Sequence, residues 1–176
     1  LDKLKKFLNV LPPTTNYNHD TMIQQEAEFR VDEIFFKKKV GNILAGTLLT
    51  GTIKEQEKLL LGPIGEFGDF IPVEVQTVQR YRVPSRIVRA GQTAALSIGN
   101  LETNEKLRKG MVLVSSKVQP KACKEFEAEI YLLFHANKIS PGFQATIHVG
   151  NVCQTAKIIK MDKVYNLFFH LFLILN

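Results

Sequence analysis

The chain has 176 residues, a length that suits one ordinary domain or two small domains that share an interface. Hydrophobic residues make up 45% of the chain and charged residues 23%, and this balance excludes an intrinsically disordered protein. The formal net charge of +6 favours contact with polyanions such as RNA, but charge alone does not identify the partner, so the clustering of basic residues matters more.

Features of a secreted protein are missing from the sequence. The N-terminal residues contain no basic stretch followed by an apolar core and a small-residue cleavage site, as a secretory signal would require. Cys123 and Cys153 are the only cysteines, a usage typical of a reducing compartment rather than of a disulfide scaffold. We therefore expect a cytoplasmic protein.

The first residues predict a helix, because apolar side chains recur at helical spacing at Leu1, Leu4, Phe7, Leu8 and Leu11. Pro12 and Pro13 end this pattern. We expect the apolar face of the helix to pack against a region that precedes residue 1. The polar residues 14–25 predict a linker.

From residue 26 onward the chain consists of short β-rich runs about ten residues apart, each bounded by Gly, Pro or Asn. No strong helical pattern interrupts them, which predicts an all-β sandwich or barrel, and a barrel also removes exposed edges. The expected strands are residues 27–35, 43–49, 58–61, 72–82, 93–101, 111–114, 126–133, 144–149 and 156–161.

Gly41, Gly46 and Gly51 recur every five residues around an apolar and β-branched run. Glycines in this arrangement allow tight turns and close packing of backbones at barrel corners. A phosphate-binding loop would need a helix after the glycines, and another strand is expected there instead. We therefore expect turn chemistry at these positions.

The sequence predicts neither a nucleotide site nor a catalytic site. None of the eleven glycines is followed by Lys, so the chain has no phosphate loop. In residues 137–140 (NKIS), Ser140 stands where a guanine-recognition motif needs an acidic residue. No nucleophile elbow of the Gly-x-Ser-x-Gly kind occurs. We expect no catalytic residues in this chain, which is therefore not an enzyme by itself.

Four residues have side chains that can bind zinc: Cys123, Cys153, His135 and His148. No two of them lie two to four residues apart, as the ligand pairs of structural zinc sites usually do. We therefore expect neither a metal site nor a bound cofactor in this chain.

Between Val75 and Leu101 the sequence has no acidic residue, while Tyr81 lies among four arginines, Arg80, Arg82, Arg86 and Arg89. Arginines interleaved with an aromatic ring can neutralise phosphates and stack on a terminal base. If residues 78–82 are extended, Gln79 and Tyr81 face one side of the strand and Arg80 and Arg82 the other. The alternative, a solvated strand edge, remains open on these residues alone.

Several motifs resemble the second domain of elongation factor Tu and its relatives. Residues 29–35 (FRVDEIF), 40–47 (VGNILAGT) and 51–53 (GTI) are similar to the opening of that domain. Residues 88–94 (VRAGQTA) resemble the family's arginine-alanine-glycine corner. Residues 107–113 (LRKGMVL) are similar to its charged turn before the last strand. The motifs follow one another in the family's order and at its spacing.

The resemblance continues beyond the second domain. Residues 126–130 (FEAEI) are similar to the start of the family's third domain. Residues 8–13 (LNVLPP), 140–144 (SPGFQ) and 154–156 (QTA) resemble the subfamily of animal GTP-binding proteins 1 and 2. The chain is thereby identified as a member of the translational GTPase family. The resemblance implies a translation-factor-type β-barrel followed by a partial second β-barrel.

The resemblance also implies a division of the chain. Residues 1–25 would be the end of a GTPase-domain helix and a linker, and residues 26–118 the second-domain barrel. Residues 119–163 would be part of the third-domain barrel. Residues 164–176 depart from the family pattern and form an apolar tail, which is too short to span a bilayer as a helix of about 20 residues. Its uncharged, proline-free composition is typical of aggregation-prone segments, and we expect its deletion to raise soluble yield.

In elongation factors the second domain receives the aminoacylated 3′ end of transfer RNA, and residues 78–92 align with the segment concerned. The resemblance implies that Phe35, Gln79, Tyr81 and Arg82 contact RNA. Gln79 is an amide where elongation factor Tu has a carboxylate, so the charge is lost but hydrogen bonding is retained. The expected partners are transfer RNA or ribosomal RNA and the parent's GTPase domain, which would bind GTP and magnesium. Neither DNA nor a membrane is expected.

Two other functions remain open from the residues. A plain β-barrel could bind a protein through an exposed strand edge without RNA. A stand-alone enzyme would need an acidic pair such as Asp32 and Glu33, but adjacent residues of a regular strand face opposite sides.

Overall fold

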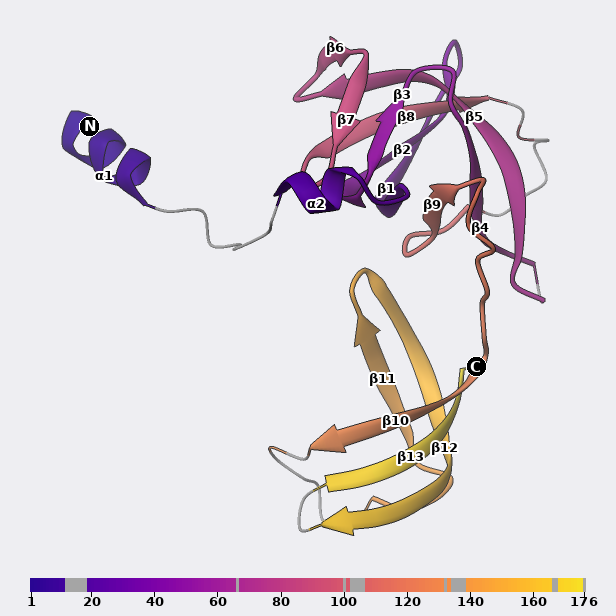
Figure 1. The fold of residues 1–176 in the computed structure, drawn as a ribbon. Helices are drawn as coiled ribbons and strands as arrows, with labels where there is room; N and C mark the ends of the chain where they lie inside the picture. Colours follow the sequence, from indigo (N-terminus) through magenta and orange to yellow (C-terminus); the bar gives the residue numbers. More distant parts are fainter. Residues whose placement is uncertain are drawn as a thin grey trace.

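The computed structural model describes residues 1–11, 19–65, 67–99, 101, 107–131, 133, 139–165 and 168–175. Within these residues, two helices precede thirteen strands, which form two β-structures in succession along the chain (Figure 1). The all-β prediction is confirmed.

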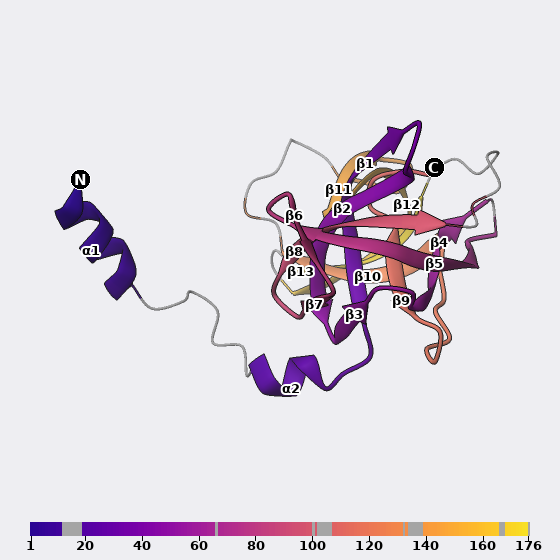
Figure 2. The ribbon, with the colours of Figure 1, turned by 90° about the horizontal axis from the view of Figure 1, so that it is seen from above.

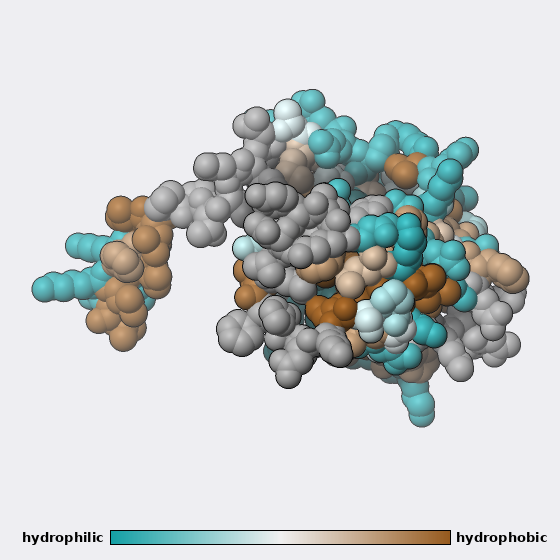
Figure 3. Space-filling view, turned by 90° about the horizontal axis from the view of Figure 1, so that it is seen from below, coloured by the Kyte–Doolittle hydropathy of each residue, from teal (hydrophilic) through white to brown (hydrophobic). Residues whose placement is uncertain are grey.

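The predicted N-terminal helix is present as α1, which comprises Asp2–Val10. None of its residues is buried, and it lies apart from the strands (Figure 2), with its apolar side chains collected on part of its surface (Figure 3). A second helix, α2 (His19–Ile23), lies within the predicted linker, and the carbonyl oxygen of Met22 accepts a hydrogen bond from Gly51 N at 2.7 Å. Among the described residues, no helix is long and apolar enough to cross a membrane.

The first β-structure is a seven-stranded sheet in the order β4-β9-β1-β2-β8-β5-β6, and an additional pairing of β4 with β5 closes six of these strands into a barrel. A two-stranded ribbon of β3 and β7 accompanies it. The strands are β1 (Glu28–Lys37), β2 (Gly41–Thr50), β3 (Thr52–Lys54), β4 (Lys58–Ile64), β5 (Asp69–Arg80), β6 (Val83–Ser85), β7 (Ile87–Arg89), β8 (Thr93–Gly99) and β9 (Val112–Ser115).

Alternation of side chains explains the barrel core. In β2, Leu44 and Leu48 are buried, while the intervening Ala45 and Thr47 are only partly covered. β1 contributes Phe29 to the same core. Because successive side chains of a strand point to opposite faces, each strand supplies one apolar row to the interior.

The three regularly spaced glycines have the roles that the sequence predicts. Gly41 and Gly51 have φ angles of +84° and +76°, which favour glycine over other residues. Gly46 lies against the backbone of β1, where a Cβ would meet the carbonyl group of Arg30. Turn geometry and close backbone approach therefore account for all three.

The second β-structure is an open four-stranded sheet in the order β10-β13-β12-β11, which agrees with the predicted partial barrel. Its strands are β10 (Glu125–Tyr131), β11 (Gln144–Val149), β12 (Val152–Tyr165) and β13 (Phe168–Leu175). β13 belongs to the segment that the sequence assigns to a tail outside this sheet. The expected end of the sheet at residue 163 is therefore corrected, because β13 pairs with both β10 and β12.

The composition of β13 indicates a tail rather than a strand of the sheet, because both of its faces are apolar. Leu171 and Leu173 are buried in a small core with Ile158 of β12, whereas Phe172 is only partly covered. The ammonium nitrogen of Lys160 lies 5.4 Å from the ring centre of Phe172, a cation–π arrangement that covers this outer face.

Candidate nucleic-acid interface

A row of four paired residues crosses the outer face of the barrel. Glu33 of β1 pairs with Ala45 of β2, Ala45 with Ala95 of β8, and Ala95 with Gln79 of β5. Directly paired residues of antiparallel strands project to the same face, so two small alanines lie between two long polar side chains. This pattern leaves a depression on the barrel surface.

The depression is a cavity of about 340 Å³, a volume within the range of ligand pockets, about 300 to 1,000 Å³. The alanines form its floor, and its walls include Gln79, Tyr81 and Arg82 on one side and Asp32 and Glu33 on the other. Three of the four residues proposed from the sequence to contact RNA therefore line one cavity.

Asp32 and Glu33 reach the same cavity because β1 is irregular between them. The register with β2 shifts between Val31 and Glu33, so Asp32 is the extra residue of a β-bulge. The expectation that adjacent residues face opposite sides holds for a regular strand and is wrong here, since both Asp32 and Glu33 line the cavity.

The extended conformation considered for residues 78–82 is also corrected. β5 ends at Arg80, which pairs with Val83 of β6, so Tyr81 and Arg82 form a two-residue hairpin turn. Their φ angles are +51° and +67°, as the tight turns favoured in hairpins require. Asn and Gly usually occupy such positions, and a left-handed conformation costs an ordinary residue about 1 to 3 kcal/mol.

The side chain of Tyr81 is presented to solvent at the rim of the cavity, with 82% of its surface exposed. The guanidinium carbon of Arg80 lies 6.0 Å from the Tyr81 ring centre, at the outer limit of a cation–π contact. The Nε of Arg80 is buried, and no described group accepts a hydrogen bond from it. An aromatic ring and two arginines thus meet at this turn.

Other residues from the predicted cluster lie elsewhere. Phe35 is half exposed and is not part of the cavity wall; it lies two residues beyond Glu33 on β1. Arg89 belongs to β7 and pairs with Thr52 of β3, outside the cavity. Arg86 precedes β7 and does not line the cavity either.

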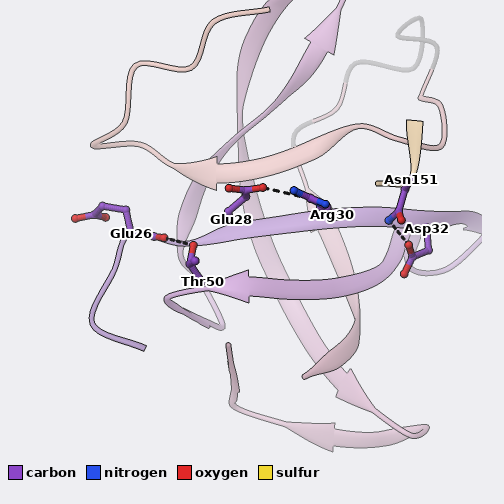
Figure 4. Close-up of polar contacts among 6 residues, drawn as sticks. All are labelled: Glu26, Glu28, Arg30, Asp32, Thr50 and Asn151. Atoms are coloured by element: carbon purple, nitrogen blue, oxygen red, sulfur yellow. Dashed lines mark hydrogen bonds and ion pairs between the residues drawn. The ribbon is translucent and has the colours of Figure 1, made fainter. Parts of the chain in front are cut away.

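Two contacts hold the acidic wall. The ammonium nitrogen of Lys109 lies 3.9 Å from Glu33 Oε1. The side-chain amide of Asn151, from the turn between β11 and β12, donates a hydrogen bond to Asp32 Oδ1 (Figure 4). A residue of the second sheet therefore touches a residue of the cavity in the first barrel.

Of the four candidate zinc ligands, three lie in the described part of the chain, and two of these are close together. Cys153 Sγ lies 3.8 Å from His148 Nε2, while Cys123 is exposed on the segment before β10. His135 lies outside the described residues. Within the described ranges, no group of three or more His, Cys, Asp or Glu residues is arranged to hold a metal ion.

Glu26 lies at the start of the barrel, away from the cavity. A hydrogen bond from Ser115 is the main cause that lowers the pKa of the Glu26 carboxyl; burial opposes it, and the charge of the nearby Lys117 and a hydrogen bond from it lower the pKa further. The Lys117 ammonium lies 3.4 Å from Glu26 Oε1, so the segment after β9 contacts the segment before β1.

Sequence reasoning missed the part of the site contributed by Asp32, Lys109 and Asn151. A signal for the bulge is present, because the apolar positions Phe29 and Val31 are followed by Ile34 and so depart from the period of two. No comparable signal links Asn151 to Asp32, since that contact depends on how the two β-structures dock.

Comparisons with known proteins agree with this fold. Residues 41–114 match the family model of elongation factor Tu domain 2. GTP-binding protein 2 of Mus musculus is 48% identical over 162 residues, which cover 92% of this chain and 27% of that protein. GTP-binding protein 1 of Xenopus laevis is 41% identical over 163 residues, covering 93% and 24% respectively. The chain thus spans about a quarter of the length of these curated relatives.

Among solved structures, the fold resembles translation elongation factor SelB from Methanococcus maripaludis in its apo form. The TM-score is 0.70 at 14% identity, and the similarity covers 99% of this chain and 38% of SelB. Such low identity shows shared fold alone. The sequence matches show that residues 41–114 are an elongation factor Tu domain 2 and that most of the chain is similar to GTP-binding proteins 1 and 2.

Proposed function

We propose that the first barrel docks an RNA end, that of transfer RNA or of ribosomal RNA, in the cavity between β1 and β5. The observation that carries this proposal is the Tyr81–Arg82 turn at the cavity rim. Two residues with large functional side chains hold a conformation that glycine would adopt at lower cost, and such strain is concentrated at ligand-binding sites.

The chemistry of the cavity supports an RNA ligand. The exposed ring of Tyr81 offers a stacking surface for a base, and Arg82 offers a cation for a phosphate. Carboxylates accept hydrogen bonds, so Asp32 and Glu33 suit ribose hydroxyls or an amino group. Gln79 can both donate and accept.

Fluorescence anisotropy of labelled transfer RNA with the full chain tests the proposal. Tyr81→Ala removes a stacking contribution of about 1 to 3 kcal/mol, whereas Tyr81→Phe keeps the ring and is expected to bind like wild type. Arg82→Ala is expected to lower the slope of log affinity against log salt by about one. Arg89→Ala, a matched change outside the cavity, is expected to leave the affinity unchanged within twofold. Equal binding by wild type, Tyr81→Ala and Arg82→Ala would show that the turn has no role in RNA docking.

A protein-interaction module is the second candidate, and the second sheet favours it. Among the described strands of that sheet, β10 and β11 each have a single neighbour, so each leaves one edge able to pair with an extended peptide. A salt titration separates the two functions, because RNA docking through arginines weakens steeply with salt and edge pairing hardly changes.

The activity of a full-length relative is part of the proposal. We propose that a GTPase domain outside residues 1–176 binds GTP and magnesium and that the barrels carry its nucleotide state to RNA on the ribosome in the cytoplasm. Rigid-body movement of the barrels relative to that domain would transmit the change.

A further inference from the structure

The turn between β11 and β12 approaches the acidic wall of the cavity. Val149 pairs with Val152, which leaves Gly150 and Asn151 as the two turn residues. Figure 4 shows the Asn151 side chain from this turn directed at Asp32, to which it donates a hydrogen bond. The turn belongs to the second sheet, and Asp32 belongs to the first barrel.

Two glycines lie where this approach is close. A Cβ on Gly150 would lie 2.6 Å from Arg30 Nη1, and a Cβ on Gly110 would lie 3.2 Å from Val152 Cγ2. Both glycines have positive φ angles, +56° and +86°. A side chain at residue 150 would have to displace the flexible end of Arg30, and one at residue 110 would have to shift Val152 by a few tenths of an ångström, so the turn lies close against the barrel at both positions.

Asp32 connects this contact to the cavity. Asp32 is the bulged residue of β1, lines the cavity and accepts the hydrogen bond from Asn151. A carboxylate has about four lone-pair sites on two oxygens, so a bond from Asn151 to Oδ1 leaves Oδ2 for a ligand. The same bond restricts the rotation of the Asp32 side chain, which no strand pairing holds at the bulge.

We infer that Asn151 is a positioning residue for the cavity: it fixes the Asp32 carboxylate at the cavity wall, so that ligand binding and docking of the β11–β12 turn favour each other. Coupling of this kind is reciprocal, because a ligand that prefers the fixed carboxylate must also stabilise the docked turn. The inference rests on the proposed function only for the identity of the ligand.

The experiment uses the full chain and two measurements without RNA. Asn151→Ala is expected to accelerate amide hydrogen exchange at residues 149–152 about fivefold, the lower end of coupling between sites, and to shift the carbonyl carbon resonance of the Asp32 side chain. Asn151→Asp is expected to accelerate exchange further, because two carboxylates then face each other. Exchanging the partners in the double variant Asp32→Asn, Asn151→Asp restores a donor and an acceptor and is expected to restore protection. Thr146→Ala, an exposed change in β11, is the control and leaves both measurements unchanged.

Binding of labelled transfer RNA is the third measurement, with an expected loss of about fivefold for Asn151→Ala by the same coupling. The double variant regains turn protection but not RNA affinity, since the cavity then lacks the Asp32 carboxylate. If Asn151→Ala changes neither RNA-free measurement, the inference is wrong whatever RNA does. If it changes both while RNA affinity stays at the wild-type value, the coupling is wrong. If wild type binds no RNA while both RNA-free measurements respond, the positioning role stands and the proposed function fails.

Discussion

Gly46 of β2 lies so close to Arg30 of β1 that a Cβ built on the glycine would be 1.9 Å from the Arg30 carbonyl oxygen. The obstacle is backbone in the middle of a paired strand, and it cannot rotate away as a side chain could. The two strands therefore approach closely only because residue 46 is glycine.

Gly46→Ala is expected to lower the free energy of unfolding by about 3 kcal/mol, the upper part of the range for overpacking. Gly65→Ala is the matched control, because a Cβ there meets nothing within 4 Å but must adopt a φ angle of +67°. That change is expected to cost only about 1 kcal/mol from backbone strain. Urea denaturation followed by circular dichroism measures both, and equal losses would show that strain and not the clash governs position 46.

Replacing the strained hairpin turn is expected to stabilise the barrel and weaken RNA docking. Tyr81→Asn combined with Arg82→Gly introduces residues that favour positive φ and is expected to raise the free energy of unfolding by about 1 kcal/mol. The same variant is expected to lose the stacking ring and the cation at the cavity rim. Thermal unfolding and transfer RNA binding measure the two effects. A variant that is stabilised and binds RNA normally would show that the strained turn has no role in RNA docking.

β13 is expected to be essential for the second sheet. Leu173→Ala removes a buried side chain and is expected to cost that sheet about 2 to 5 kcal/mol, whereas Ile174→Ala, on the partly exposed face, costs less. Deleting residues 164–176 is expected to unfold the second sheet and lower soluble yield, the reverse of the outcome predicted from sequence alone. The first barrel has its own core and remains folded. Hydrogen exchange resolved by residue checks this, and an intact second sheet after deletion would contradict the role of β13.

Glu26 is expected to give the barrel an acid-sensitive contact. Its pKa is lowered mainly by the hydrogen bond from Ser115, so its contribution to stability is present above the ordinary carboxyl pKa and is lost as pH falls through the lowered value. Ser115→Ala is expected to raise the pKa of Glu26, measured by NMR titration of its carboxyl carbon. Lys109→Ala, which removes the partner of Glu33, leaves Glu26 unaffected. An unchanged titration in Ser115→Ala would assign the shift to Lys117.

The chain is expected to bind no GTP, because its sequence contains no phosphate loop and its residues 137–140 lack the acidic residue of a guanine site. Calorimetry with GTP and magnesium measures this. Saturable binding at micromolar concentrations would contradict the assignment of the nucleotide site to a domain outside residues 1–176.

Much of the first barrel can be predicted from sequence because its strands alternate. In β2, Leu44 and Leu48 fall on one face and Gly41 begins the strand at a turn. The alternation of apolar residues and the turn glycine therefore indicate the same strand. β13 offers no alternation, since Phe172 and Ile174 are as apolar as Leu171 and Leu173, and only its pairing distinguishes the faces.

The candidate site could be predicted only in part. Tyr81 and Arg82 are identifiable from composition and resemblance, but the sequence does not predict that they form a turn, because neither residue type favours positive φ. The Asn151–Asp32 contact joins residues that are far apart in the sequence, and only the folded chain brings the turn at Gly150 and Asn151 close to Arg30 and Asp32.

The strand order of the second sheet also sets a sequence of events during synthesis. β11 and β12 are joined by a two-residue turn and can pair as soon as both have left the ribosome. β10 is made earlier, but Glu125 must wait for Ile174, about 50 residues later, before it has a partner. Until β13 is made, the nascent chain has a folded first barrel followed by β10, both edges of which are unpaired. Exposed strand edges promote aggregation, so the chain is expected to need a chaperone most during this interval.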